Sequence, residues 1–198
     1  MNILTRSALC CAFICCALLL AAAPAEARTI RIVACGDSAT SGWLVPRDKA
    51  YPAQLQTLLR GKGHDVVVEN AGVPGDTTAG ALRRFDQAIG PGTDVALVEF
   101  GTNDLRRRVP VATMHAHLAD IVRTLRARRV EVLLIGLGGL DLSGVAKANE
   151  VAYAQWQLPR GQYRARDGAH FNAEGYAILL ARTLPQIERL IAKVPSRR

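Results

Sequence analysis

Four short polar motifs sit at the ends of apolar runs in this chain, and their residue types could together carry out acyl transfer. The motifs are Gly36-Asp37-Ser38, Asn70-Ala71-Gly72, Gly101-Thr102-Asn103-Asp104 and Asp167-Gly168-Ala169-His170. A serine hydroxyl attacks a carbonyl carbon when a base removes its proton, and the oxyanion then formed needs hydrogen-bond donors. The motifs hold a serine, a histidine, carboxylates and amides, so they predict ester cleavage through an acyl-enzyme.

Each chemical role has a candidate residue. We expect Ser38 to be the nucleophile and His170 its base, because histidine titrates near neutral pH. Asp167, three residues before His170, would accept the imidazole Nδ1–H and fix the tautomer of the ring. Three oxyanion donors are expected: the backbone N–H of Ser38, the backbone N–H of Gly72 and the side-chain amide of Asn103.

The elements that must position these residues alternate along the chain. Apolar, β-branched runs predict strands at 30–35, 66–69, 95–100 and 130–135, with a weaker one at 151–156. Helical patterns lie at 51–60, 78–89, 111–128 and 173–192, and Thr77 or Thr78 and Asn172 could cap two of these helices. This alternation predicts an α/β fold with a parallel sheet covered on both faces. The first three motifs each follow a strand, where the ligand crevice of such a sheet lies.

The first 27 residues are typical of a signal peptide. Arg6 precedes an apolar run over 8–23, and Ala25-Glu26-Ala27 is a small-x-small cleavage site. We therefore expect an exported protein, periplasmic or secreted, whose mature domain spans 28–198. An uncleaved membrane anchor is the alternative. Of the five cysteines, Cys35 is the one in the mature part, so no internal disulfide is expected and Cys35 should pack as a small hydrophobe.

The chain is basic, with a formal net charge of +8. A solvated basic surface is one explanation, and weak contact with an anionic membrane surface or a glycan is the other. Aromatic residues make up 5% of the chain and no nucleic-acid motif is present, so no nucleic-acid partner is expected. We expect a monomer that acts on a small ester or lipid-like substrate.

Other functions fit these residues less well. The nucleophile motif of α/β-hydrolases is Gly-x-Ser-x-Gly, and its last position is Thr40 here. The small-residue loop at 35–42 could bind phosphate, but it lacks the Gly-x4-Gly-Lys-Ser/Thr pattern. A catalytically inactive relative that binds glycans or lipids is a third alternative.

The four motifs resemble those of the SGNH, or GDSL-type, hydrolases, which are named for the residues matched here by Ser38, Gly72, Asn103 and His170. The resemblance covers essentially all of the mature chain, and the segment 70–81, NAGVPGDTTAGA, is most similar to the small bacterial arylesterase, thioesterase I and lysophospholipase group. It implies a flavodoxin-like, three-layer α/β/α sandwich with a central five-stranded parallel sheet. It also implies acyl-enzyme chemistry on esters, thioesters or lysophospholipids without metal or cofactor. Asp37 would then be structural in the nucleophile turn, and Asp104 would support the loop that holds Asn103.

The chain departs from this family pattern at three places. Ala39 replaces the usual Leu after the nucleophile, and Phe171 replaces the usual Pro after the histidine. The connection at 137–150 is short, and its glycines suggest an irregular course. A short connection predicts a shallow, open acyl site, with a carbohydrate O-acetylesterase as the alternative activity.

Overall fold

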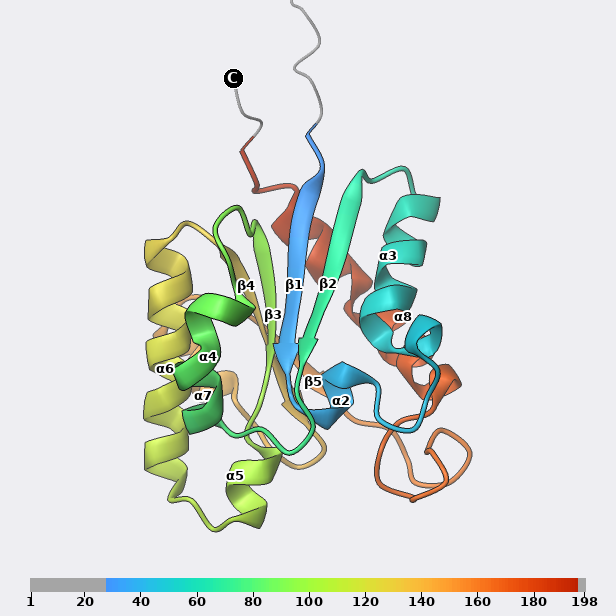
Figure 1. Ribbon diagram of the computed structural model, residues 1–198, viewed down its shortest axis with the longest axis vertical. Helices are drawn as coiled ribbons and strands as arrows, with labels where there is room; N and C mark the ends of the chain where they lie inside the picture. Colours follow the sequence, from blue (N-terminus) through green and yellow to red (C-terminus); the bar gives the residue numbers. More distant parts are fainter. Residues whose placement is uncertain (1–27, 196–198) are drawn as a thin grey trace, which may run out of the picture. The chain divides into compact units, whose positions relative to one another are not determined.

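Five parallel strands form the centre of the fold, in the spatial order β2-β1-β3-β4-β5 (Figure 1). They are β1 (Ile30–Gly36), β2 (Val66–Gly72), β3 (Val95–Glu99), β4 (Glu131–Leu137) and β5 (Ala152–Trp156). The structure is a computed structural model and describes residues 28–195, so the predicted signal peptide at 1–27 lies outside the described residues. The five predicted strands are confirmed, and every neighbouring pair is parallel.

Helices cover both faces of this sheet. Figure 1 shows α3 (Tyr51–Gly61) and α8 (Ala173–Ile191) on one face, with α4 (Thr78–Ala88), α6 (Val111–Ala127) and α7 (Ser143–Ala148) on the other. Because side chains alternate along a strand, the side chains on each face of the sheet pack in a separate hydrophobic core. The three-layer α/β/α sandwich expected from the sequence is therefore confirmed.

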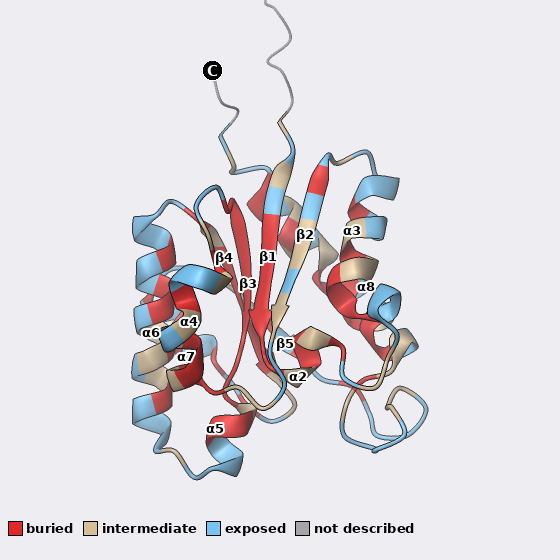
Figure 2. Ribbon diagram, in the orientation of Figure 1, coloured by how far each residue is buried: buried red, intermediate tan, exposed pale blue. Residues whose placement is uncertain are grey.

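The two cores are built from alternate residues of the same strands. Ile32 of β1 packs in the core beneath α3 and α8, and its neighbour Val33 packs in the core beneath α4 and α6. The central strands are accordingly buried along most of their length (Figure 2). Cys35 packs in the second core as predicted, and burial raises the pKa of its thiol to about 11. Such a thiol is not an alternative nucleophile to Ser38.

The strand order places a crevice at the carboxyl ends of β1 and β3. The chain moves from β1 to one edge of the sheet at β2, then returns to the other side of β1 at β3, so the direction of winding reverses at β1. Ligands bind open α/β sheets at such a reversal, outside the carboxyl ends of the strands. Two short helices follow these strand ends, α2 (Ser38–Ser41) and α5 (Thr102–Arg106).

Some boundaries differ from those expected. β2 continues to Gly72, three residues beyond its predicted end, because Gly72 pairs in register with Gly36 of β1. The 137–150 connection is not irregular throughout, since it contains α7. Three short helices lie outside the helical ranges predicted from the sequence: α2, α5 and η2 (Arg47–Lys49). Within 28–195, no helix is long and apolar enough to cross a bilayer.

Candidate active site

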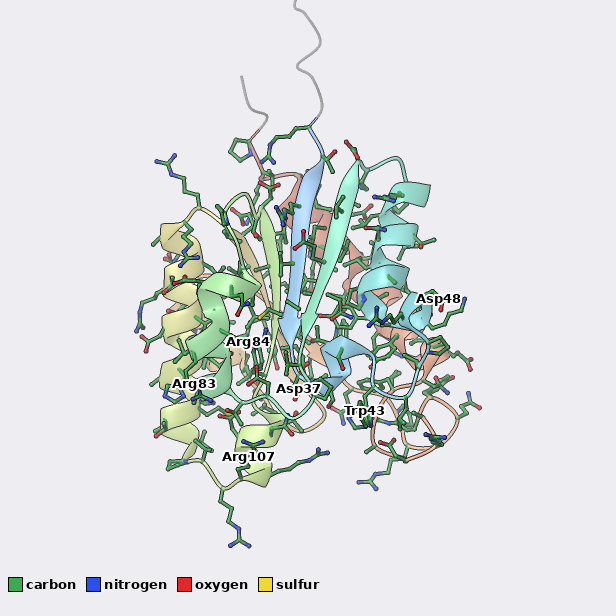
Figure 3. All side chains as sticks on the ribbon, viewed as in Figure 1. Asp37, Trp43, Asp48, Arg83, Arg84 and Arg107 are labelled. Atoms are coloured by element: carbon green, nitrogen blue, oxygen red, sulfur yellow. The ribbon has the colours of Figure 1, made fainter. Side chains whose placement is uncertain are left out.

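The turn after β1 presents Ser38 at the edge of the sheet. β1 ends at Gly36 and α2 begins at Ser38, so Asp37 alone separates strand from helix. Asp37 caps α2, because its Oδ1 accepts the N–H of Ala39 at 2.9 Å. The hydroxyl of Tyr176 on α8 donates to the Ala39 carbonyl at 2.8 Å. Figure 3 shows Asp37 beside the arrow ends of β1 and β2.

The structure brings Ser38, His170 and Asp167 into one hydrogen-bonded chain. Ser38 Oγ lies 2.8 Å from His170 Nε2, and His170 Nδ1 lies 2.5 Å from Asp167 Oδ2. Asp167 Oδ1 also accepts the N–H groups of Ala169 and His170, at 3.0 and 3.1 Å. The hydrogen bond from the His170 side chain is the main reason that the pKa of Asp167 is lowered to about 2. The carboxylate therefore stays charged at neutral pH, opposite the imidazole.

The loop that carries His170 is held by bonds from its own residues. The Ala165 N–H donates to the His170 carbonyl at 2.8 Å, and Arg164 Nη1 donates to the Ala169 carbonyl at 2.9 Å. The Arg164 guanidinium also lies over the ring of Phe171, 4.3 Å from its centre. Phe171 is 3% exposed and packs edge-on against Tyr176. Phe171, which stands where the family usually has proline, therefore anchors this loop.

Asn103 contacts the nucleophile turn from the neighbouring strand. Its Nδ2 donates to Asp37 Oδ2 at 2.9 Å and to the Asp76 carbonyl at 2.8 Å, so both amide protons have a partner. Asp104, the next residue, accepts both the N–H and the hydroxyl of Thr78, at 3.0 and 2.6 Å. These bonds tie α5 to the start of α4.

Gly72 lies elsewhere than we expected. It is the last residue of β2, and its N–H donates to Asn70 Oδ1 at 3.0 Å, so this donor is already used inside its own motif. A Cβ on Gly72 would lie 2.2 Å from the backbone nitrogen of Ser41. The glycine therefore lets β2 pack against α2, and the prediction that its N–H faces a substrate is corrected.

The next glycine, Gly75, lies close to Asn103. Pro74 and Gly75 form the centre of a tight turn in which the Asp76 N–H donates to the Val73 carbonyl at 3.1 Å. Gly75 has φ +78, which the third position of a type II turn requires and which glycine adopts without strain. Its N–H donates to no group within residues 28–195. The Pro-Gly pair is visible in the sequence as a turn signal, but the sequence does not show which N–H is left free.

Arg84 anchors this turn to the end of β1. Its Nε forms an ion pair with Asp76 Oδ2 at 2.7 Å, and its two Nη atoms donate to the carbonyls of Ala71 and Gly36, at 2.9 and 3.2 Å. In Figure 3 the Arg84 side chain reaches from α4 toward the strand ends near Asp37. Through Arg84, α4 therefore holds in place the turn that contains Gly75.

A buried glutamate beneath the nucleophile turn was not anticipated. Glu99 is the last residue of β3, is 1% exposed, and accepts the Thr40 hydroxyl at 3.0 Å. Burial first, and the nearby charge of Asp37 second, raise the pKa of Glu99 well above its usual value. Burial also raises the pKa of Asp37, but the bonds that Asp37 accepts from Ala39 and Asn103 favour its charged form. We therefore assign the shared negative charge to Asp37 and the proton to Glu99.

This assignment predicts that Glu99→Gln is tolerated. Glutamine keeps an acceptor for Thr40 and mimics the neutral acid. Because the folded-state pKa of Glu99 is raised, the unfolded chain loses this proton first, and wild-type stability falls as pH rises above about 4.3. Thermal unfolding of both proteins from pH 5 to pH 8 should show the variant gaining relative to wild type as pH rises. A difference in unfolding temperature that stays constant from pH 5 to pH 8 would show that Glu99 is already ionised in the folded protein at pH 5.

A small pocket opens beside Ser38 and His170. Its volume is about 140 Å³, and its walls include Ala39, Leu137 and Phe171 together with Arg106 and Arg164. Pockets for drug-sized ligands are commonly about 300 Å³ or more. The geometry thus provides a hydroxyl next to an imidazole and a small space where a reacting carbonyl group fits.

Three sequence matches show which known proteins this chain is similar to. The model of the GDSL-like Lipase/Acylhydrolase family matches residues 34–161. An arylesterase of Vibrio mimicus is 30% identical over 106 residues, which is 53% of each chain. Esterase TesA of Pseudomonas aeruginosa is 33% identical over 124 residues, which is 62% of this chain and 61% of that protein. The matched parts thus span between about half and three-fifths of these curated relatives.

Solved structures agree with the family match. The crystal structure of the lipase/acylhydrolase from Enterococcus faecalis is 25% identical, with a TM-score of 0.69, and the match covers 86% of this chain and all of that one. The family model spans most of the sheet, from β1 into the loop after β5, and includes three of the four motifs. The chain therefore belongs to the GDSL-like lipase/acylhydrolase family, whose members are the SGNH or GDSL-type hydrolases that its motifs resemble.

Proposed function

We propose that this protein is a serine esterase that hydrolyses carboxylic esters through an acyl-enzyme. The observation that carries the proposal is the continuous chain from Ser38 Oγ through His170 to Asp167, with contacts of 2.8 and 2.5 Å. A serine whose hydroxyl contacts an oriented imidazole is an activated nucleophile. The names of the similar proteins, arylesterase and esterase, support the same reaction class.

The steps follow from the positions of these atoms. Ser38 Oγ attacks the carbonyl carbon while His170 Nε2 takes the hydroxyl proton, and Asp167 stabilises the imidazolium. The C–O bond to the leaving group then breaks, and His170 returns the proton to the departing alcohol. Water repeats the sequence on the acyl-enzyme, with His170 again as the base, and releases the acid and free Ser38.

The oxyanion is assigned three donors in this proposal. They are the N–H of Ser38, the N–H of Gly75 in place of Gly72, and Nδ2 of Asn103. Within residues 28–195, the N–H groups of Ser38 and Gly75 donate to no protein acceptor. Asn103 already donates to Asp37 and Asp76, so its amide would share or exchange one of these bonds as charge develops.

Export belongs to the same proposal and rests on the sequence alone. The apolar run at 8–23 and the small-x-small site at 25–27 favour removal of the first 27 residues and action in the periplasm or outside the cell. We also propose that the protein acts as a monomer.

The test of the activity is a series of 4-nitrophenyl esters, and it also tests the size of the acyl group. A site that encloses the chain gains about 0.8 kcal/mol for each CH₂, or close to fourfold in kcat/KM. The pocket of about 140 Å³ is too small for that gain to continue, and Trp43, 48% exposed, is not part of its wall. Acetyl and butyryl esters should therefore be cleaved with higher kcat/KM than octanoyl esters.

Two outcomes would contradict these statements separately. No hydrolysis of any ester in the series, or of an acetylated glycan and a lysophospholipid assayed beside it, would contradict the esterase. Hydrolysis that rises steadily from two to ten carbons would keep the esterase but show that a longer acyl-binding surface exists.

A further inference from the structure

The pocket beside Ser38 has arginines on its wall that lack a carboxylate partner. Arg106, the last residue of α5, and Arg164, in the loop before α8, both line it. Elsewhere in residues 28–195, several arginines form ion pairs with carboxylates: Arg31, Arg84, Arg123, Arg126 and Arg128. Neither Arg106 nor Arg164 forms such a pair within this part of the chain. The wall also includes Asp37, whose negative charge is held by bonds from Ala39 and Asn103, so its two arginines exceed its one acid.

The two pocket arginines differ in how firmly hydrogen bonds hold their guanidinium groups. Arg164 donates from its Nη atoms to the carbonyls of Ala169 and Leu158 and stacks on Phe171, so its charge is fixed in place. Arg106 is exposed, and no hydrogen bond within residues 28–195 holds its guanidinium. Burial raises the pKa of Asp37, and the charge of Arg106 acts against that rise, so Arg106 lies within electrostatic reach of the nucleophile turn.

The sequence around both residues reinforces the charge. Arg107 and Arg108 follow Arg106, and Arg160 and Arg166 flank Arg164. Each of the two segments, 101–110 and 157–172, contains a single acidic residue. Asp104 is buried against Thr78, and Asp167 is bound by His170. Neither acid is therefore free to compensate the arginines, and both borders of the pocket are basic.

We propose that the site prefers esters that carry an anionic group, a carboxylate or a phosphate, within a few bonds of the scissile carbonyl, and that Arg106 binds that anion. The inference rests on the esterase proposed above. A guanidinium presents paired N–H donors that match carboxylate and phosphate oxygens, and its charge strengthens each bond. The small pocket places such an anion and the carbonyl next to Ser38 together, while the fixed charge of Arg164 adds to the attraction.

The test compares two matched pairs of substrates, which differ in where the anion lies. In the first pair the charge is on the acyl group, as 4-nitrophenyl hydrogen succinate against 4-nitrophenyl butyrate. In the second it is on the leaving group, as 4-acetoxybenzoate against its methyl ester. For each pair, the ratio of kcat/KM for the anionic to the neutral ester is measured in wild type and in variants. Intrinsic reactivity cancels when these ratios are compared between proteins.

In Arg106→Gln the anionic-to-neutral ratio should fall about tenfold for at least one pair, the loss expected for a charged hydrogen bond. The pair that responds shows whether the anion lies on the acyl or the leaving-group side. Arg106→Lys should keep most of the preference, because it keeps the charge. The wild-type ratio should also fall between about 0.02 M and about 0.5 M salt.

Arg189→Gln is the matched control. It removes the same charge from an exposed position about 24 Å along α8 from the start of that helix, and its ratios should equal those of wild type. If Arg106→Gln also leaves both ratios at the wild-type values while neutral esters are still cleaved, the anion preference is wrong and the esterase stands. If wild type cleaves neither the neutral nor the anionic esters, the esterase itself is wrong and the preference fails with it.

Discussion

Replacing Ser38 by alanine should lower kcat for ester hydrolysis by about 10⁶-fold, the loss seen when a serine hydrolase is deprived of its nucleophile. The Ser38 hydroxyl lies 2.8 Å from a histidine nitrogen, and the acyl-enzyme cannot form without it. The same substitution should abolish covalent labelling by an organophosphonate, measured by the mass of the intact protein. Peptide mapping of labelled wild type should place the adduct on Ser38.

Ser143→Ala serves as the control for this prediction. Ser143 is an exposed serine that begins α7, and its labelling and turnover should equal those of wild type. Circular dichroism of Ser38→Ala should show that the fold is intact, because the shorter bonds that hold the turn, to Asp37 and from Tyr176, remain. Full ester hydrolysis by a folded Ser38→Ala protein would overturn the mechanism.

Asp167→Asn should lower kcat by about 10⁴-fold with little change in fold. Asparagine can still accept the N–H groups of Ala169 and His170 through its oxygen, so the loop should keep its course. Its NH₂ would then face His170 Nδ1 as a donor where the carboxylate accepted. The ring would hold its proton on Nε2, and that nitrogen could no longer take the proton of Ser38.

The pH dependence separates this effect from a simple loss of charge. The pKa of Asp167 is lowered to about 2, so in wild type the carboxylate stays ionised at all pH values above about 4. Acid loss of wild-type activity in that range therefore cannot come from Asp167. The kcat of Asp167→Asn should stay low from pH 5 to pH 9, because the wrong tautomer is not relieved by pH. A variant that regains wild-type kcat at high pH would contradict the tautomer argument.

The strands and the main helices could be predicted from the sequence because their signals are local. Apolar runs such as 95–100 and caps such as Thr77 and Asn172 act over a few residues, and the structure confirms them. The likeness of the four motifs to one family also pointed to the correct three-layer fold. The first three motifs each follow a strand, which places Ser38 at the carboxyl edge of the sheet, and His170 reaches the same edge from the loop before α8.

Contacts between distant residues were decided by the tertiary structure. Asn103 bonds to Asp37 across 66 positions in sequence, and Glu99 accepts from Thr40 across 59, and no periodicity encodes such pairs. The short helices α2, α5 and α7 are too brief to form on local preference, so packing against the sheet ends must stabilise them.

The choice of glycine for the proposed oxyanion site shows the difference most directly. Gly72 and Gly75 are three residues apart, and both lack a Cβ, so composition cannot choose between them. Pairing with β1 takes Gly72 into the sheet, where Asn70 binds its N–H. The turn at Pro74 leaves the N–H of Gly75 free next to Asn103. Residue type limits which groups can act in this site, and the backbone hydrogen bonds of the folded chain determine which of them are left to do so.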